Sequence, residues 1–90
     1  MMKNFKNTEI ADLIKKFRKK RNISQLELSR VCGLKNAQFF SNIERGIAEY
    51  PLDTLAIIIK YLDLSADEKL QLNKSFINFQ KKVIAKVISG

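Results

Sequence analysis

The chain has few of the residues that build metal sites and disulfides. Its 90 residues include no histidine and a single cysteine, Cys32. The usual zinc clusters need several residues of these two types, and a lone cysteine cannot form an internal disulfide. We therefore expect no metal ion and no cofactor. Cys32 is either a redox-sensing thiol or a small buried residue, and no neighbouring residue predicts a lowered thiol pKa.

Proline, glycine and long apolar runs are also scarce. One proline and three glycines, with 46% hydrophobic residues and no alternation of polar and apolar positions, indicate a single compact helical domain. No apolar run approaches the roughly 18 residues of a membrane span, and the N-terminus lacks the apolar core of a signal peptide. We expect a cytoplasmic protein with no membrane partner.

The sequence shows no catalytic constellation. Histidine is absent, and we find neither a nucleophile paired with a base nor a glycine-rich loop that binds phosphate. We therefore expect no enzymatic activity.

Acidic residues are few compared with basic ones. The chain has 17 Lys and Arg against 9 Asp and Glu, a net charge of +8, and the surplus is concentrated in residues 1–24. Such a surface attracts DNA, because each neutralised phosphate releases counterions. A lysine-rich helix face is also common simply because it is well solvated. Charge alone does not decide between the two.

Two helices joined by a tight turn are predicted between Ser24 and Gly46. Ser24 and Glu27 have the spacing of a capping box, so a helix begins after Ser24. This helix ends near Cys32, and Gly33 has the backbone freedom that a sharp turn needs.

A second helix of about ten residues follows this turn. Asn36 can cap its start, Phe40 and Ile43 give it an apolar side, and Gly46 ends it. The pair is therefore two short amphipathic helices in a chain with a basic N-terminal part.

Three further helices flank this pair. The first is capped by Asn7 or Thr8 and has apolar residues at helical spacing: Ile10, Leu13, Ile14 and Phe17. Another follows Pro51 and ends at Asp63, with a broad apolar side made of Leu52, Leu55, Ile58, Ile59 and Leu62. The last begins after a second capping box, Ser65 with Glu68, and continues to about Val87.

These residues resemble the helix-turn-helix family of phage repressors and Cro, often called the xenobiotic-response-element family. The resemblance covers roughly residues 10–65 and rests on the order of five motifs: Phe17-Arg18, Ile23-Ser24-Gln25-Leu26-Glu27-Leu28, Ile43-Glu44-Arg45-Gly46, Thr54-Leu55, and Leu62 with Leu64. It implies an all-α, five-helix, lambda-repressor-like fold with an extended C-terminal helix. We expect residues 1–66 to form the DNA-binding domain and residues 67–90 the C-terminal helix.

The resemblance also implies which residues contact bases. Residues 37–45 form the recognition helix, and Gln38 and Asn42, four apart on one face, lie against base edges. An amide can bind adenine N6 and N7 bidentately in the major groove. The remaining expected base contacts are Ala37, Lys35 and Phe39. Lys35 alternatively reaches a phosphate, and Phe39 alternatively fills a gap between helices.

Other side chains are expected to hold phosphates or to orient the helices. The phosphate contacts are Gln25, Arg45, Lys19, Lys20, Arg21 and Asn36. Glu44 in this family pairs with an arginine at the position of Arg18, so we expect a structural ion pair between these two rather than base contacts.

The C-terminal helix is apolar over about half of its circumference, more than one small core buries. Leu70, Ile77, Ile84 and Ile88 form one line, and a neighbouring line continues the same face. We expect the distal part to meet a second subunit through Leu72, Phe76, Phe79, Val83, Ile84 and Val87. Two alternatives are that both lines cover the domain's own core, or that the helix lies on a membrane surface.

The sequence thus predicts a sequence-specific DNA-binding transcriptional regulator. It would bind a two-fold operator as a homodimer, with half-sites 10 to 10.5 base pairs apart. The repressor label follows from the resemblance alone. The alternative is an antitoxin or another protein-binding module, whose C-terminal helix binds a partner protein through Phe76, Phe79, Val83 and Ile84.

Overall fold

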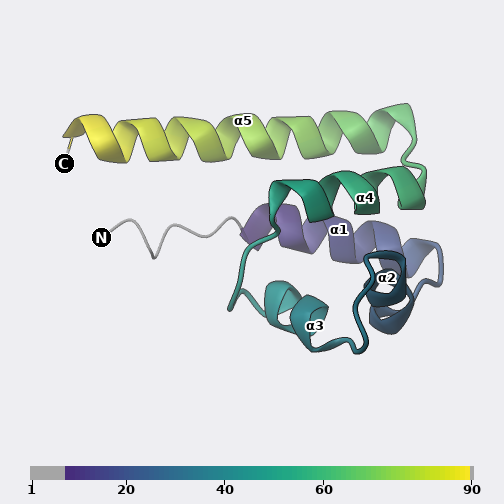
Figure 1. Cartoon of the computed structure of the whole chain (residues 1–90). Helices are drawn as coiled ribbons and strands as arrows, with labels where there is room; N and C mark the ends of the chain where they lie inside the picture. The colour runs from purple at the N-terminus through teal and green to yellow at the C-terminus, as the bar shows by residue number, and fades with distance from the viewer. Residues whose placement is uncertain (1–7, 90) are drawn as a thin grey trace.

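The computed structural model describes residues 8–89, and no strand occurs in this range. Its helices are α1 (Thr8–Lys20), α2 (Gln25–Val31), α3 (Gln38–Glu44), α4 (Leu52–Leu62) and α5 (Ala66–Ser89). Figure 1 shows α5 on one side of α1 and α3 on the other, and α1 contacts both. The predicted all-α fold with a long C-terminal helix is confirmed.

One apolar core joins all five of these helices. Each contributes a side chain that is at most 5% exposed, and these are Ile10, Leu28, Phe40, Leu55 and Leu72. Burial explains the apolar spacing of α1 and of Leu55, Ile58 and Leu62 in α4, whereas Leu52, expected on the same apolar side, is 79% exposed at the start of the helix. Phe40 and Ile43 of α3 are fully buried, as expected.

Local signals fix most of the helix ends. The Ser24 hydroxyl accepts a hydrogen bond from the Glu27 N–H at 3.0 Å, which caps α2. Ser65 and Glu68 form both bonds of a capping box before α5, at 2.8 and 3.2 Å. Gly33 has a φ of 79°, a conformation that costs glycine little. These predicted caps and the predicted turn are present.

The recognition helix is shorter than predicted. It spans Gln38–Glu44 rather than residues 37–45, and Ala37 occupies the N-cap position without a side-chain cap. Asn36 still satisfies one free donor of the helix, because its Oδ1 accepts from the Gln38 N–H at 3.0 Å. Asn36 therefore caps the helix from the position before the N-cap, whereas we expected it at the N-cap itself.

The first half of α5 packs on the rest of the domain. Leu72 is 4% exposed within the core, and the Ser75 hydroxyl donates to Glu9 Oε1 at 2.6 Å. The expectation that Leu72 lies in a dimer interface is therefore wrong, because it is buried in the core of its own domain. The division at residue 66 likewise separates side chains that share one core. The C-terminal part of α5 extends past the other helices (Figure 1).

Candidate nucleic-acid interface

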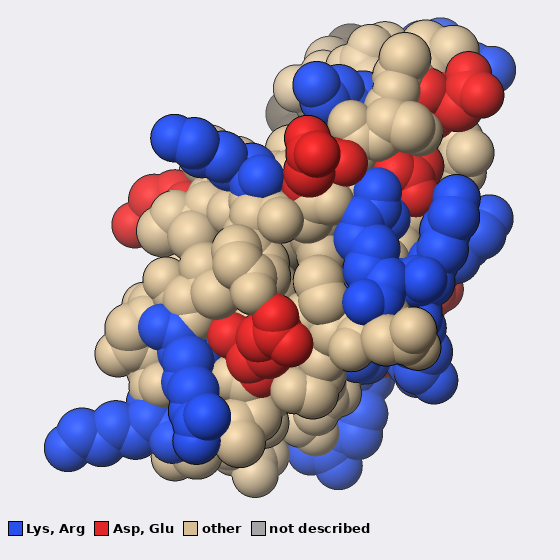
Figure 2. Space-filling model, turned by 90° about the vertical axis from the view of Figure 1, so that its right-hand side faces the viewer, with Lys and Arg blue, Asp and Glu red and all other residues tan. Residues whose placement is uncertain are grey.

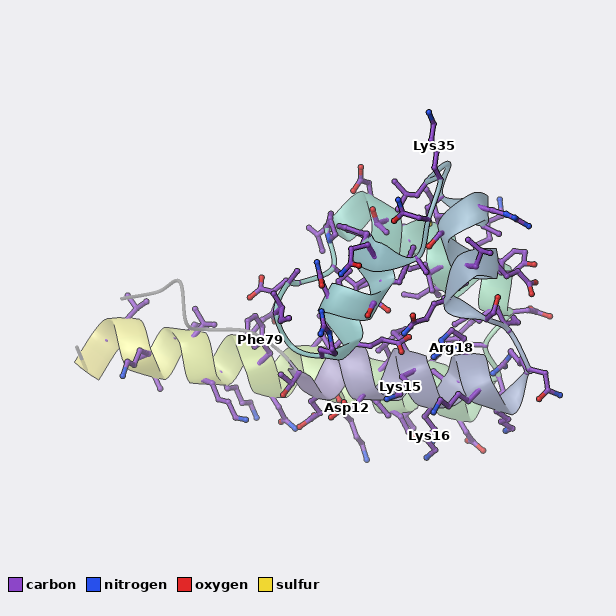
Figure 3. The ribbon with its side chains drawn as sticks, turned by 90° about the horizontal axis from the view of Figure 1, so that it is seen from below. Asp12, Lys15, Lys16, Arg18, Lys35 and Phe79 are labelled. Carbon is purple, nitrogen blue, oxygen red and sulfur yellow. The ribbon has the colours of Figure 1, made fainter. Side chains whose placement is uncertain are left out.

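A buried ion pair fastens α3 to α1. The Arg18 guanidinium donates from Nε and Nη2 to the two Glu44 carboxylate oxygens, each at 2.9 Å, and the side chains are 8% and 2% exposed. Arg18 Nη1 also donates to the Ile23 carbonyl at 2.7 Å. Figure 3 shows Arg18 pointing from α1 toward the short helices. The resemblance implied this pairing, and the geometry fixes the C-terminal end of α3.

Gln25 joins the same network. Its Nε2 donates to Glu44 Oε1 at 2.8 Å, so the start of α2 is tied to the end of α3. A side-chain amide has two N–H groups, and the second remains for another acceptor such as a phosphate oxygen. Because Glu44 holds this amide in place, Gln25 sits at a fixed position beside the recognition helix.

The polar face of α3 carries the two expected base-contacting amides side by side. Gln38 Nε2 donates to Asn42 Oδ1 at 2.9 Å, and Arg45 Nη2 donates to the same oxygen at 2.9 Å. Gln38 and Arg45 are exposed and Asn42 is half-buried. The Asn42 amide oxygen thus accepts from Gln38, an expected base contact, and from Arg45, an expected phosphate contact. The three side chains are therefore held together along α3.

The turn before α3 places further polar groups near its start. Lys35 is exposed and projects away from the molecule at the tip of the turn (Figure 3). Ala37 is half-buried at the N-cap. Phe39 packs against the core, with its ring edge-on to Phe40 at 5.4 Å. Its position therefore agrees with the gap-filling alternative, and only part of the ring is left for a base.

The three basic residues at the end of α1 have different surroundings. Lys19 is exposed. Arg21 donates to both oxygens of Glu68, at 2.5 and 3.0 Å, and to the carbonyls of Phe17 and Asp63. Lys20 Nζ lies 3.7 Å from the same Glu68 carboxylate. Arg21 thus holds α1 to the start of α5, so we do not retain it as a phosphate contact.

Figure 2 shows this end of the molecule, where Lys and Arg side chains cover much of the surface and acidic groups lie between them.

The Glu68 carboxylate is stabilised in its charged form. The hydrogen bond from Arg21, and after it the hydrogen bond from the Ser65 N–H, lowers the pKa of Glu68 to about 2. The sequence predicted the capping role of Glu68 from its spacing to Ser65. It gave no signal for Arg21, which is 47 residues away.

Two tyrosines also have roles that sequence patterns missed. The Tyr61 hydroxyl donates to the Glu27 carboxylate and connects α4 to α2, and this bond raises the Tyr61 pKa. The Tyr50 hydroxyl is buried and has no hydrogen-bond partner among residues 8–89. Burial, and after it the charge of Glu44, raises the pKa of Tyr50.

Other site types were searched for over the same residues. From Thr8 to Ser89, acidic and cysteine side chains form no group of three that would hold a metal ion. None of the helices in this part of the chain is both long and apolar enough to cross a bilayer. Burial raises the pKa of the Cys32 thiol, which disfavours the reactive thiolate.

Comparison with known proteins identifies the fold. Residues 14–69, more than half of the chain, match the family model described as helix-turn-helix, and this range includes both partners of the Arg18–Glu44 ion pair and the whole of α3. No curated protein and no solved structure gave a significant match. The chain therefore belongs to the helix-turn-helix family of DNA-binding regulatory domains, within its xenobiotic-response-element group.

Proposed function

We propose that the protein is a sequence-specific transcriptional repressor that binds a two-fold operator as a homodimer. α3 enters the major groove, where the four base pairs present distinct patterns of donors and acceptors. Gln38 and Asn42 contact base edges there, with Ala37, Lys35 and the free part of Phe39 at the edge of the contact. Regulation by repression follows the family rather than a particular residue.

One observation carries this proposal: the two amides of α3 lie together on its accessible face, while Arg18 and Glu44 fix that helix from behind. Bidentate recognition needs an amide held in a defined orientation. Asn42 Oδ1 provides this by accepting from both Gln38 and Arg45. The apolar side of the same helix is fully buried at Phe40 and Ile43, so only the polar side is left to face DNA.

Phosphate contacts frame the recognition helix. Gln25 and Arg45 both lie at the C-terminal end of this helix, where Gln25 bonds to Glu44 and Arg45 is the C-cap. Asn36 precedes its first turn, and Lys19 and Lys20 add charge from the end of α1. These groups position the protein without distinguishing sequences. Lys20 also lies near Glu68, so its share of the phosphate contact is smaller than that of Lys19.

The distal part of α5 supplies the dimer contact. Its C-terminal part extends past the other helices (Figure 1), and Ile84 and Val87 are 56% and 62% exposed. A contiguous exposed apolar face of this kind marks an interaction surface. Val83, which is half-buried, continues the same stripe.

Selection from random duplexes tests the proposal. The intact chain should enrich one two-fold sequence with half-sites 10 to 10.5 base pairs apart. A Gln38→Ala, Asn42→Ala double variant should retain non-specific binding and lose this enrichment. Asn78→Ala, an exposed amide on α5, is the matched control. Enrichment of no sequence by the intact chain would remove the claim of specific recognition.

The exposed end of α5 also favours a second candidate, a protein-binding module such as an antitoxin. Deletion of residues 75–90 separates the two. A repressor should lose dimerisation and operator affinity together, because its half-sites are bound cooperatively. An antitoxin should lose binding of its partner protein, while the remaining residues 1–74 keep their affinity for DNA.

A further inference from the structure

The side-chain amides of Gln38 and Asn42 are held in one orientation by the arginine beside them. The Arg45 guanidinium carries only donors, so the Asn42 atom that lies 2.9 Å from its Nη2 is the acceptor oxygen Oδ1. Because this oxygen cannot donate, the Gln38 atom that lies 2.9 Å from it is the donor Nε2. The nitrogen and oxygen of an amide have nearly the same shape, and here the guanidinium decides which atom is which.

These two hydrogen bonds decide which groups are left to contact bases. An amide oxygen has two lone pairs, and the donors from Gln38 and Arg45 occupy both lone pairs of Asn42 Oδ1. Asn42 Nδ2 has two N–H groups, and neither makes a hydrogen bond within residues 8–89. Asn42 therefore offers donors alone, whereas Gln38 retains its oxygen and one N–H.

We infer that Asn42 recognises guanine, an inference that rests on the proposed binding of α3 in the major groove. Guanine is the base whose major-groove edge has two neighbouring acceptors, O6 and N7, and no donor. Adenine and cytosine each present an amino group there, which needs an acceptor that Asn42 no longer has. Thymine has one acceptor, O4, beside a methyl group. The two free N–H groups of Asn42 thus match guanine best.

Gln38 retains the groups that match adenine. Its oxygen can accept from adenine N6, and its remaining N–H can donate to N7. The bond between the two amides spans 2.9 Å, close to the separation of about 3.4 Å between neighbouring base pairs. Gln38 and Asn42 can therefore contact neighbouring bases without breaking this bond. Each half-site should contain a guanine next to an adenine, and only Gln38 makes the adenine contact that the sequence suggested for either amide.

A substitution of nearly unchanged shape tests the inference. Selection from random duplexes with the intact chain should give guanine at one position of each half-site. Asn42→Asp replaces the free amide nitrogen by an oxygen and leaves Oδ1 as the acceptor for Gln38 and Arg45. It should change the preferred base at that position to cytosine or adenine, because a carboxylate accepts from an amino group. Gln38→Ala is the matched control, since it should relax the preference for the neighbouring adenine and keep the guanine.

A modified base gives a second measurement, on the intact chain. 7-Deazaguanine has a C–H group in place of N7, so it lacks one acceptor for Asn42. In the selected duplex it should weaken binding by about threefold to tenfold, as expected for one hydrogen bond. The same modified base outside the half-sites is the control and should leave the affinity unchanged. An affinity that is also unchanged at the half-site guanine would overturn the inference, even if Asn42→Asp binds too weakly for selection.

Arg45 is a positioning residue in this arrangement, because it acts on the base through Asn42. Loss of a phosphate contact alone would weaken binding to all sequences equally. Arg45→Ala also frees one lone pair of Asn42 Oδ1, so Asn42 can accept from adenine. The preference for guanine over adenine at this position should therefore fall by about fivefold or more. Competition between the two duplexes measures this ratio, and an unchanged ratio would overturn the positioning role.

The outcomes separate this inference from the proposed function. The intact chain could select a two-fold sequence in which Asn42→Asp changes no position, or in which the changed position holds adenine for the intact chain. Guanine is then wrongly assigned to Asn42, and sequence-specific binding stands. If the intact chain enriches no sequence, both the assignment and the proposed function fail.

Discussion

The Arg18 guanidinium and the Glu44 carboxylate meet in two parallel hydrogen bonds of 2.9 Å, although 26 residues separate them in the chain. The bonds join α1 to the end of α3, so the orientation of α3 depends on an ion pair that is buried inside the domain. Parallel double bonds of this kind fix direction as well as distance.

Removing one partner of this pair should cost far more stability than removing both. Glu44→Ala leaves the Arg18 charge buried and uncompensated, and we expect the free energy of unfolding to fall by about 3 to 5 kcal/mol. A double variant, Arg18→Met with Glu44→Leu, should recover much of this loss. Urea denaturation measures both, with the exposed Arg45→Ala as the control. Equal losses in the single and double variants would contradict a buried pair.

The shared oxygen of Asn42 predicts a difference between two substitutions. Asn42→Asp keeps an acceptor for Gln38 and Arg45, so the base preference that depends on Gln38 should survive while the added negative charge lowers affinity for all sequences. Asn42→Ala removes the acceptor and should relax specificity at particular bases by about 1 to 3 kcal/mol. Competition among single-base variants of the selected duplex measures this. An unchanged preference in Asn42→Ala would show that Gln38 is not held by Asn42.

Salt should have opposite effects on DNA binding and self-association. DNA binding weakens with salt, because released counterions drive it. Association of two lysine-rich α5 helices should strengthen, because salt screens their repulsion. Lys19→Ala should reduce the slope of log affinity against log salt by about 1, whereas Lys69→Ala, on the opposite side from α3, should not. Fluorescence anisotropy and sedimentation measure the two equilibria.

Glu68 should make the protein lose stability in acid. Its folded-state pKa of about 2 lies below the ordinary value of 4.5, so the stabilisation is fully present above about pH 5. It should be lost as the pH falls from about 4.5 to about 2. Glu68→Gln should be less stable at neutral pH and show a flatter decline over this range. The urea midpoint at each pH checks this, with Asp67→Asn as the matched neighbour.

Replacement of Tyr50 by Phe should not destabilise the protein. Its buried hydroxyl has no hydrogen-bond partner in the described part of the chain, and an unsatisfied buried group costs about 1 to 3 kcal/mol. Tyr50→Phe should therefore leave the thermal midpoint unchanged or raise it, whereas Phe40→Leu in the same cluster should lower it. A clear drop for Tyr50→Phe would mean that the hydroxyl has a partner.

Features set by neighbouring residues were predictable from the sequence. The caps at Ser24 and Ser65 and the left-handed residue Asp63, with a φ of 51°, depend on groups within four positions. The start of α3 was displaced by one residue, because Asn36 bonds to the Gln38 N–H rather than occupying the cap itself.

Features set by distant packing were not predictable in this way. A helical wheel identified the apolar lines of α5, but it does not show where the covering domain ends, so Leu72 was placed at the wrong surface. Likewise the sequence did not distinguish Arg21 from Lys19 and Lys20, which we propose as phosphate contacts. Arg21 is bound to Glu68 because the start of α5 lies beside the end of α1, and this contact is visible only in the folded chain.

The hydrogen bond between Ser75 and Glu9 holds the middle of α5 to α1, so a small tilt there moves the projecting C-terminal half of the helix by a larger distance. No glycine or proline interrupts the helix, and about 20 Å separate Ser75 from Ile88 at about 1.5 Å per residue. A tilt of about 10° at the fastening would move the tip by about 3 Å, close to the 3.4 Å step between neighbouring base pairs. In a two-fold dimer joined at the C-terminal ends of α5, small changes in packing near Ser75 would therefore alter the distance between the two α3 helices that meet a duplex.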